Sequence, residues 1–277
     1  MHPDSKLSEL EWAVARPDAD IELARTALVI AKSEYPALDV DAYLDRLNAL
    51  TRRAETGNAA SDPLGQLHRL RECLFEEEGF AGNAEDYGDP RNSYLNDVLD
   101  RRLGIPISLS LVLIEVGRRL GLDMEGIGLP GHFITAARVG GEQLLLDPFN
   151  RGAILTAEGC REVVARAVGG PVELAPEHFA PVTNRQFLTR MLTNLKGSYW
   201  RREEWGKVVA VIDRLLLLNP TAAGEWRDRG IAWTHQGEIA RGLADWERYL
   251  TEFPDAPDHE QVKGHLRRMR HKMARLN

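Results

Sequence analysis

The first third of the chain shows apolar residues that recur every three or four positions. Between Ile21 and Ala31 they fall on one broad face, and this pattern stops before Pro36. It returns at 41–53 and again at 64–75. This spacing matches the 3.6-residue period of an amphipathic helix. We therefore predict a helical N-terminal region over residues 1–80.

Two polar stretches interrupt or end these predicted helices. Residues 56–63 read as a polar turn, and the acidic run Glu76-Glu77-Glu78 is followed by Gly79. We interpret the acidic run as a solvated helix end rather than as a metal site. Residues 80–92 are rich in Gly, Asn and Asp and are predicted to form a loop.

The middle of the chain begins with two further predicted helices. The first covers 94–102 and ends before Gly104, and Pro106 suits the first turn of the second. The run 108–120 is apolar on nearly all sides until its last arginines. A helix that is apolar all round is typical of the centre of a domain.

The pattern then changes to short apolar segments separated by turn residues. They cover 124–129, 133–139 and 143–146, and Gly140-Gly141 joins the last two. Two apolar runs joined by Gly-Gly predict a β-hairpin. The fold class is therefore α+β, with a central helix packed on an antiparallel sheet.

The last hundred residues are helical again and repeat with a period of 34. Pro220 and Pro254 are separated by this interval. The other pairs at the same offset are Tyr199 and Trp233, Gly206 and Ala240, Val209 and Leu243, Ile212 and Trp246, and Leu216 and Leu250. This period is the tetratricopeptide signature. We expect three regions: residues 1–80, a core at 81–182 and repeats at 183–277.

Composition narrows the functional classes. The 35 basic and 42 acidic residues give a net charge of −7, which disfavours a nucleic-acid or anionic-membrane surface. Cys73 and Cys160 lack metal-ligand spacing, so we expect no disulfide, metal or other cofactor. No apolar run approaches the length of a membrane span. We expect a cytoplasmic protein.

Three residues of the core have the chemistry of a nucleophile, a base and an orienting acid. They are Ser108 near a helix start, His132 after Pro130-Gly131, and Asp147 at a strand end. If the hairpin turns about Gly140-Gly141, His132 and Asp147 become diagonal neighbours on one face, with backbones about 7–8 Å apart. An aspartate at that distance can orient an imidazole.

Each of these residues also has a structural explanation. A serine in a first helical turn is often a cap, and an aspartate before Pro148 often opens a turn. A serine also needs direct contact with its base, since a helix dipole does not bring a hydroxyl near ionisation at neutral pH. Catalysis by Ser108 therefore depends on its contact with His132.

These motifs resemble the bacterial SirB group of the transglutaminase-like superfamily. The resemblance rests on DPRNSYLNDVLDRRLGIPISLSLVLIEVGRRLGL, GIGLPGHFI and LLLDPFNRGAIL, and it extends to the C-terminal repeats. It implies a papain-like core in which a helix bears a cysteine nucleophile and antiparallel strands bear His and Asp. His132 and Asp147 match the last two. The cysteine position falls on Ser108, or alternatively on Ile107 or Ser110.

The presence of serine where the family has cysteine leads to two hypotheses about function. Thiol transglutaminase chemistry is not expected, because neither cysteine lies in these motifs. The first hypothesis is a non-catalytic or regulatory protein that binds a peptide or protein partner through its repeats or core pocket, a pseudoenzyme with a remnant triad. The alternative is a serine-dependent acyl-transfer enzyme or amide hydrolase that uses Ser108, His132 and Asp147.

Overall fold

The chain divides into two compact units. The computed structural model describes residues 5–56 and 62–274, and the units are Met1–Met191 and Leu192–Asn277. Most of the polar turn expected at 56–63 lies outside the described residues. The division near 80 and 182 inferred from the sequence stays a prediction.

The first unit begins with the expected helices. They are α1 (Ser5–Val14), α2 (Leu23–Ala31), α3 (Val40–Glu55) and α4 (Pro63–Arg71), with a short 3-10 turn η1 (Asp18–Asp20) after α1. Local chemistry sets where two of them start. The Asp39 carboxylate accepts the backbone N–H groups of Asp41 and Ala42 at the start of α3. Asp62 accepts that of Gly65 at the start of α4.

The acidic run after α4 differs from the expectation of a solvated end. The helix continues as a π-helical segment, η2 (Glu72–Glu77), and Glu78 is buried, with its side chain 2% exposed. Its carboxylate forms ion pairs with Arg53 and, at 2.7 Å, with Arg102. Burial is possible because these two cations replace the hydration of the carboxylate. The prediction was therefore wrong for Glu78.

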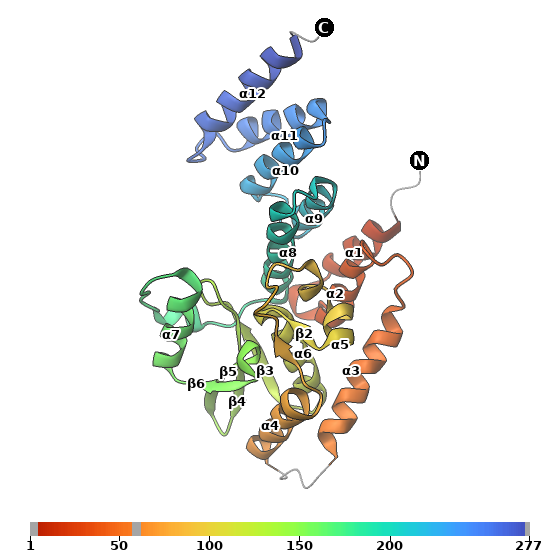
Figure 1. Cartoon of the computed structure of the whole chain (residues 1–277), viewed down its shortest axis with the longest axis vertical. Helices are drawn as coiled ribbons and strands as arrows, with labels where there is room; N and C mark the ends of the chain where they lie inside the picture. The colour runs from red at the N-terminus through yellow and green to blue at the C-terminus, as the bar shows by residue number, and fades with distance from the viewer. Residues whose placement is uncertain (1–4, 57–61, 275–277) are drawn as a thin grey trace. The chain divides into compact units, whose positions relative to one another are not determined.

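Helix α6 forms the centre of the first unit (Figure 1). It covers Pro106–Arg119, and 11 of its 14 residues are buried, as its apolar composition predicts. It contacts α2, α3, α4 and α5 (Leu95–Arg101), and it packs on the sheet. A short parallel pair, β1 (Ala81–Gly82) and β2 (Leu103–Gly104), precedes it, where the sequence predicted a loop and a helix stop. The 3-10 turn η3 (Pro90–Asn92) lies between β1 and α5.

The sheet is an antiparallel meander in the order β3-β4-β5-β6. Its strands are β3 (Asp123–Ile127), β4 (Ile134–Val139), β5 (Glu142–Asp147) and β6 (Ala153–Leu155). The register pairs Thr135 with Leu146, so paired residue numbers sum to the expected 281. The hairpin at Gly140-Gly141 therefore has the predicted register, whereas β6 was not predicted.

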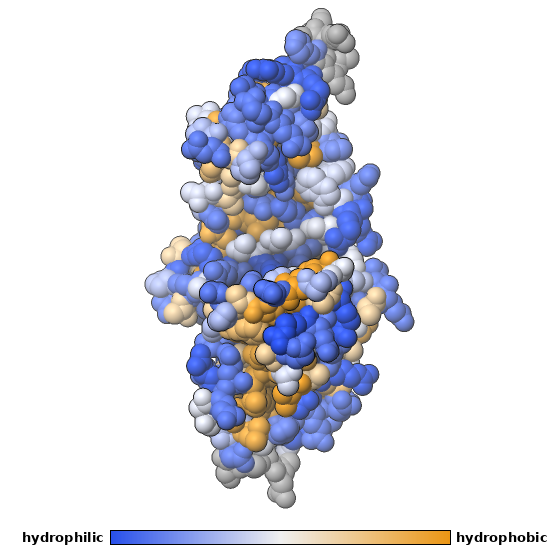
Figure 2. All heavy atoms as spheres, turned by 90° about the vertical axis from the view of Figure 1, so that its left-hand side faces the viewer, coloured by the Kyte–Doolittle hydropathy of each residue, from blue (hydrophilic) through white to orange (hydrophobic). Residues whose placement is uncertain are grey.

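A helix that the sequence did not predict, α7 (Ala157–Val168), covers part of the other sheet face (Figure 1). Its Cys160 and Val164 form an apolar cluster with Ile134 and Ala136 of β4. Figure 2 faces this side of the unit and shows hydrophobic surface there. Ile154 and Val168 are exposed apolar residues of β6 and α7. The first unit thus has a helix–sheet–helix layering.

The second unit is a stack of helical hairpins. Helix α8 (Asn184–Arg201) runs through the division between units. It is followed by α9 (Trp205–Leu218), α10 (Ala223–His235), α11 (Ile239–Glu252) and α12 (His259–Ala274). Consecutive helices from α9 to α12 pack on one another.

The 34-residue period is present in the backbone as well as in the sequence. Glu203 and Gly237 lie 34 residues apart, and both have positive φ angles, of 57° and 83°. In each turn the next residue donates its backbone N–H to the carbonyl of an aromatic residue. The Glu204 N–H donates to the Tyr199 carbonyl at 3.0 Å, and the Glu238 N–H donates to the Trp233 carbonyl at 2.9 Å. The two hairpins are therefore built on the same turn.

Candidate functional site

His132 and Asp147 lie in direct contact. The His132 Nε2 and Asp147 Oδ2 atoms are 3.0 Å apart. Asp147 ends β5 and has no exposed surface, and His132 is 8% exposed. His132 closes the turn that starts at Leu129, since its N–H donates to the Leu129 carbonyl at 3.2 Å. The diagonal pairing inferred from the hairpin thus brings these two side chains together.

The Asp147 carboxylate is also the cap of a short helical turn. Its Oδ1 accepts the backbone N–H groups of Phe149 and Asn150 at the start of η4 (Pro148–Asn150). The Asn150 side-chain amide donates to Oδ2 at 2.6 Å. Burial by itself raises the pKa of Asp147, but hydrogen bonds from His132 and Asn150 and the charge of His132 outweigh it, so the pKa lies below its ordinary value. Asp147 is therefore held as a carboxylate.

Ser108 is occupied by hydrogen bonds at the start of α6. Its hydroxyl donates to the Asn92 carbonyl at 2.6 Å and accepts the Ile105 backbone N–H at 3.1 Å. It has no exposed surface, and in the described part of the chain no hydrogen bond joins it to His132. In this arrangement the hydroxyl proton is directed at a carbonyl rather than at a base.

The two alternative positions are also enclosed. Ile107 is 1% exposed and offers no nucleophile. Ser110 is fully buried, and its hydroxyl has no hydrogen-bond partner among the described residues. The structure therefore brings His132 and Asp147 together and leaves each hydroxyl near the start of α6 without a base.

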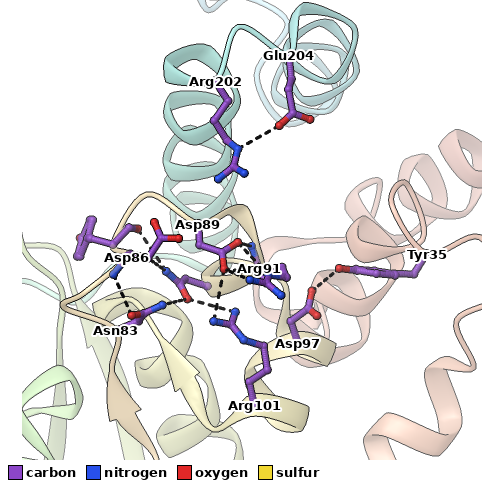
Figure 3. A network of polar contacts seen from close by, with 11 residues as sticks. Tyr35, Asn83, Asp86, Asp89, Arg91, Asp97, Arg101, Arg202 and Glu204 are labelled. Atoms are coloured by element: carbon purple, nitrogen blue, oxygen red, sulfur yellow. Dashed lines mark hydrogen bonds and ion pairs between the residues drawn. The ribbon is translucent and has the colours of Figure 1, made fainter.

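The loop before α5 fixes the carbonyl that receives the Ser108 proton. The Asn92 side-chain amide donates to the Asp86 carbonyl at 2.7 Å, and its Oδ1 accepts from Asn83 at 3.0 Å. Figure 3 shows this network. In it the buried Asp89 carboxylate also accepts a hydrogen bond from the Arg91 guanidinium. The Asn and Asp content of the loop predicted its irregular backbone, but no sequence signal indicated that Asn92 would contact α6.

Aromatic rings lie next to the His132–Asp147 pair. The Phe149 ring meets the His132 ring edge to face, with centroids 6.4 Å apart. Tyr87, which is 46% exposed, packs against Phe149 in the same way at 5.9 Å. Both aromatic residues belong to segments that the sequence assigned to turns. They give the histidine a surface that is apolar and partly accessible.

Among the described residues, the cysteines and other metal-ligand side chains do not form a second centre. Cys73 and Cys160 are both buried free thiols. Burial and then the charge of Asp147 raise the pKa of the Cys160 thiol to about 11. Across residues 5–56 and 62–274, no group of three or more His, Cys, Asp or Glu side chains is placed to hold a metal ion.

The second unit has a small cavity of its own. It measures about 210 Å³ and lies between α10, α11 and α12, with Ile231 and Trp246 among its apolar walls. Arg227, Asp228, Asp258, Gln261 and His265 supply its polar lining. Trp226 is 7% exposed and lies under the guanidinium of Arg248, 3.8 Å from the ring centroid. Trp226 and Trp246 are both buried and thus serve mainly as repeat core.

Comparison with known proteins agrees with this architecture. Residues 41–193 match the family described as the transglutaminase-like superfamily, and residues 195–267 match the tetratricopeptide repeat. The chain is 38% identical to a "UPF0162 protein" of Xylella fastidiosa (strain Temecula1) over 257 residues, which cover 90% of each chain. It is 28% identical to a "UPF0162 protein" of Vibrio cholerae, covering 91% of this chain and 93% of that one.

A further relative carries the group's name. The chain is 27% identical to "Protein SirB1" of Salmonella typhimurium over 246 residues, covering 88% of this chain and 90% of that one. No solved structure matches the chain. In the described residues, no helix is both long and apolar enough to cross a membrane. The chain therefore belongs to the transglutaminase-like superfamily, within the SirB group that carries C-terminal tetratricopeptide repeats.

Proposed function

We propose that this protein is a non-catalytic member of its superfamily that binds a peptide segment of a partner protein. The observation that carries the proposal is the state of Ser108. Its hydroxyl has no exposed surface and donates to the Asn92 carbonyl at 2.6 Å. A serine nucleophile must pass its proton to a base during attack, and this one is bonded to an acceptor that cannot serve as a base.

The repeat unit supports the binding half of the proposal. Tetratricopeptide repeats form surfaces that hold extended or helical segments of other proteins. The cavity between α10 and α12 offers apolar walls and both signs of charge. A peptide side chain inserted there would meet Ile231 and Trp246 inside and Gln261 at the exposed edge. We place this function in the cytoplasm, because two buried free cysteines suit a reducing compartment.

A second candidate function follows from the intact His132–Asp147 pair. Asp147 holds Nε2, so Nδ1 is the ring nitrogen that could serve a nucleophile. If the start of α6 rearranged so that Ser108 reached it, the three residues would have the roles of an acyl-transfer triad. This alternative predicts covalent chemistry at Ser108, which the binding proposal does not.

The two functions separate in one pair of measurements on the full chain. A fluorophosphonate probe and intact mass spectrometry test for a reactive serine, with Ser108→Ala as the matched control. A peptide array tests binding, with Gln261→Arg to fill the cavity edge and Glu260→Gln, at an exposed neighbouring site, as the control.

We expect no probe adduct, and peptide binding that survives Ser108→Ala and Glu260→Gln but weakens at least about tenfold in Gln261→Arg. An adduct that disappears in Ser108→Ala would establish the acyl-transfer alternative. Absence of any peptide binding would equally overturn the proposal.

A further inference from the structure

The turn that carries His132 is held by a side chain from a distant helix. Pro130 and Gly131, with φ of 67° at the glycine, occupy the central positions typical of a type II turn. The Arg190 Nη2 atom of α8 donates to the carbonyls at both ends of this turn, Leu129 at 3.0 Å and His132 at 3.1 Å. The guanidinium is therefore fixed beside the histidine, within the first unit.

Arg190 holds its positive charge there without a carboxylate. All its hydrogen bonds to described residues come from Nη2 and end on neutral carbonyls, which leaves Nε and Nη1 without an acceptor among those residues. Arg229, which is also partly buried, instead pairs with Asp213 and Asp245. Burial lowers the pKa of Arg190, and the nearby Tyr87 only partly opposes this. An anion beside Arg190 would offset the cost of burying this charge.

The acid that pairs with His132 does not fill that role. The Asp147 carboxylate accepts hydrogen bonds from His132, from Asn150 and from two backbone N–H groups. Asp147 is also fully buried. The negative charge of Asp147 is thus compensated by His132 and by the hydrogen bonds of its own turn, and Asp147 makes no ion pair with Arg190.

The surroundings of Arg190 are those of a recognition site. Arg190 is partly exposed, and an electrostatic interaction with Tyr87 opposes the effect of burial on the pKa of the guanidinium. Tyr87 packs on Phe149, and Phe149 packs on His132. A cation, a histidine and two aromatic rings therefore share one region. That combination suits a ligand with a carboxylate next to an apolar or aromatic group.

We propose that Arg190 binds a carboxylate of the ligand that occupies the His132 site. A free N–H of Nε or of Nη1 would donate a charge-assisted hydrogen bond to it, while the Tyr87 and Phe149 rings pack on the adjoining apolar group. The inference rests on the proposed binding function, because it adds the ligand chemistry that would be recognised beside His132 in the first unit. The carboxylate is either the C-terminus of a peptide or an acidic side chain.

The test uses the full chain and the imidazole signals of His132 in NMR spectra, assigned by their loss in His132→Gln. The first probes are hippurate, which has a carboxylate beside an aromatic amide, and its neutral methyl amide. Hippurate should shift the His132 signals in a saturable way, and the methyl amide should not. Equal responses to the two probes, or no response to hippurate, would overturn the proposal without the use of any Arg190 variant.

Variants then assign the effect to the guanidinium. Arg190→Gln should weaken hippurate binding about ten- to a hundredfold, and Arg190→Lys should retain part of the affinity. Arg118→Gln is the matched control, since Arg118 also donates to a backbone carbonyl of the first unit, that of Met124 at 2.9 Å. Affinity that is unchanged in Arg190→Gln, or lost equally in Arg118→Gln, would contradict the role of Arg190.

Peptides identify the source of the carboxylate. Acetyl-Ala-Ala-Phe with a free C-terminus, the same peptide amidated, and amidated acetyl-Ala-Glu-Phe separate a terminal carboxylate from a side-chain one. The proposed function can fail independently, because it is read from the Gln261→Arg effect on array binding. Array binding without any response at His132 rejects the carboxylate site and leaves the binding function standing.

Discussion

The Nε2 atom of His132 and the Oδ2 atom of Asp147 are 3.0 Å apart, at the junction of a type II turn and the end of β5. The pair is nearly enclosed, with side chains 9% and 0% exposed. Its carboxylate also caps η4, so the pair ties together two segments that are separated by the whole hairpin. This dual use makes Asp147 a structural residue whether or not a ligand binds.

The first prediction concerns Asp147→Asn. Because the folded-state pKa of Asp147 is lowered, its carboxylate stabilises the fold above the unfolded pKa of about 3.9, and that contribution is lost as pH falls through the folded value. We expect the variant to lose about 1–3 kcal/mol at pH 7. The difference from the parent should shrink below about pH 4.

Urea unfolding at a series of pH values measures this difference. Asp123→Asn in β3 is the control, because its side chain is 62% exposed and lies 3.7 Å from Arg138. A deficit in Asp147→Asn that stayed constant down to pH 2 would show that the carboxylate charge is not the source of the stabilisation.

Only one of two serines of α6 should lose stability when it is replaced by alanine. Ser108→Ala removes a bond to the Asn92 carbonyl and the acceptor of the Ile105 N–H, and should cost about 1–3 kcal/mol. Ser110→Ala removes a buried hydroxyl that has no hydrogen-bond partner among the described residues, and should leave stability unchanged or raise it by up to about 1 kcal/mol. Equal losses in denaturant unfolding would refute this assignment of the two hydroxyls.

Glu78→Gln tests the buried ion pair after η2. The carboxylate is 2% exposed, but Arg53 and Arg102 are 58% and 44% exposed, so solvent partly screens the interaction. We expect a loss of about 1–2 kcal/mol that decreases at high salt. Glu76→Gln is the control, since Glu76 is 63% exposed and lies 3.8 Å from Arg151, and it should change stability by less than about 0.5 kcal/mol.

Glu203→Gly should stabilise the repeat unit. Glu203 has a φ of 57°, where the equivalent position of the next hairpin already has Gly237. Glycine removes the steric cost of the left-handed conformation in the folded state, and it also makes the unfolded chain more flexible. Because the first effect is larger, we expect the free energy of unfolding to rise by about 0.5–1 kcal/mol. Glu203→Ala should give no such gain in thermal unfolding, because alanine keeps the penalty. A gain with alanine would assign the effect to the lost carboxylate instead.

Both thiols should be inert in the folded protein. Cys73 and Cys160 are fully buried, and burial raises the pKa of each thiol above its ordinary value. A disulfide reagent at pH 8 should therefore label neither residue within minutes and both in denaturant. Rapid labelling of Cys160 in the native state would show that α7 opens readily from the sheet.

The features that the sequence predicted are those that short-range patterns determine. The Gly140-Gly141 turn sets the register of β4 and β5, so the contact of His132 with Asp147 followed from counting residues. The all-apolar run of α6 likewise predicted its central place. The role of Ser108 needed a long-range contact with Asn92, and a loop's composition does not specify which carbonyl it presents.

The burial of Glu78 and the contacts of Arg190 also could not be predicted from the sequence, because both depend on residues far away in the chain. Glu78 is part of an exposed-looking acidic run, and its burial depends on cations from α3 and from the end of α5. Arg190 is one arginine among several in α8, and only the folded chain shows that it meets the carbonyls of Leu129 and His132.

The contact between α6 and the strand before it also constrains how this chain can change. A side-chain carbon added at Gly104 would lie 2.7 Å from the Ser108 hydroxyl, so the glycine leaves the room that the serine occupies. A relative with a larger residue at position 104 should therefore have a smaller one, such as glycine or alanine, at position 108. The serine at position 108 thus depends on the absence of a side chain at position 104.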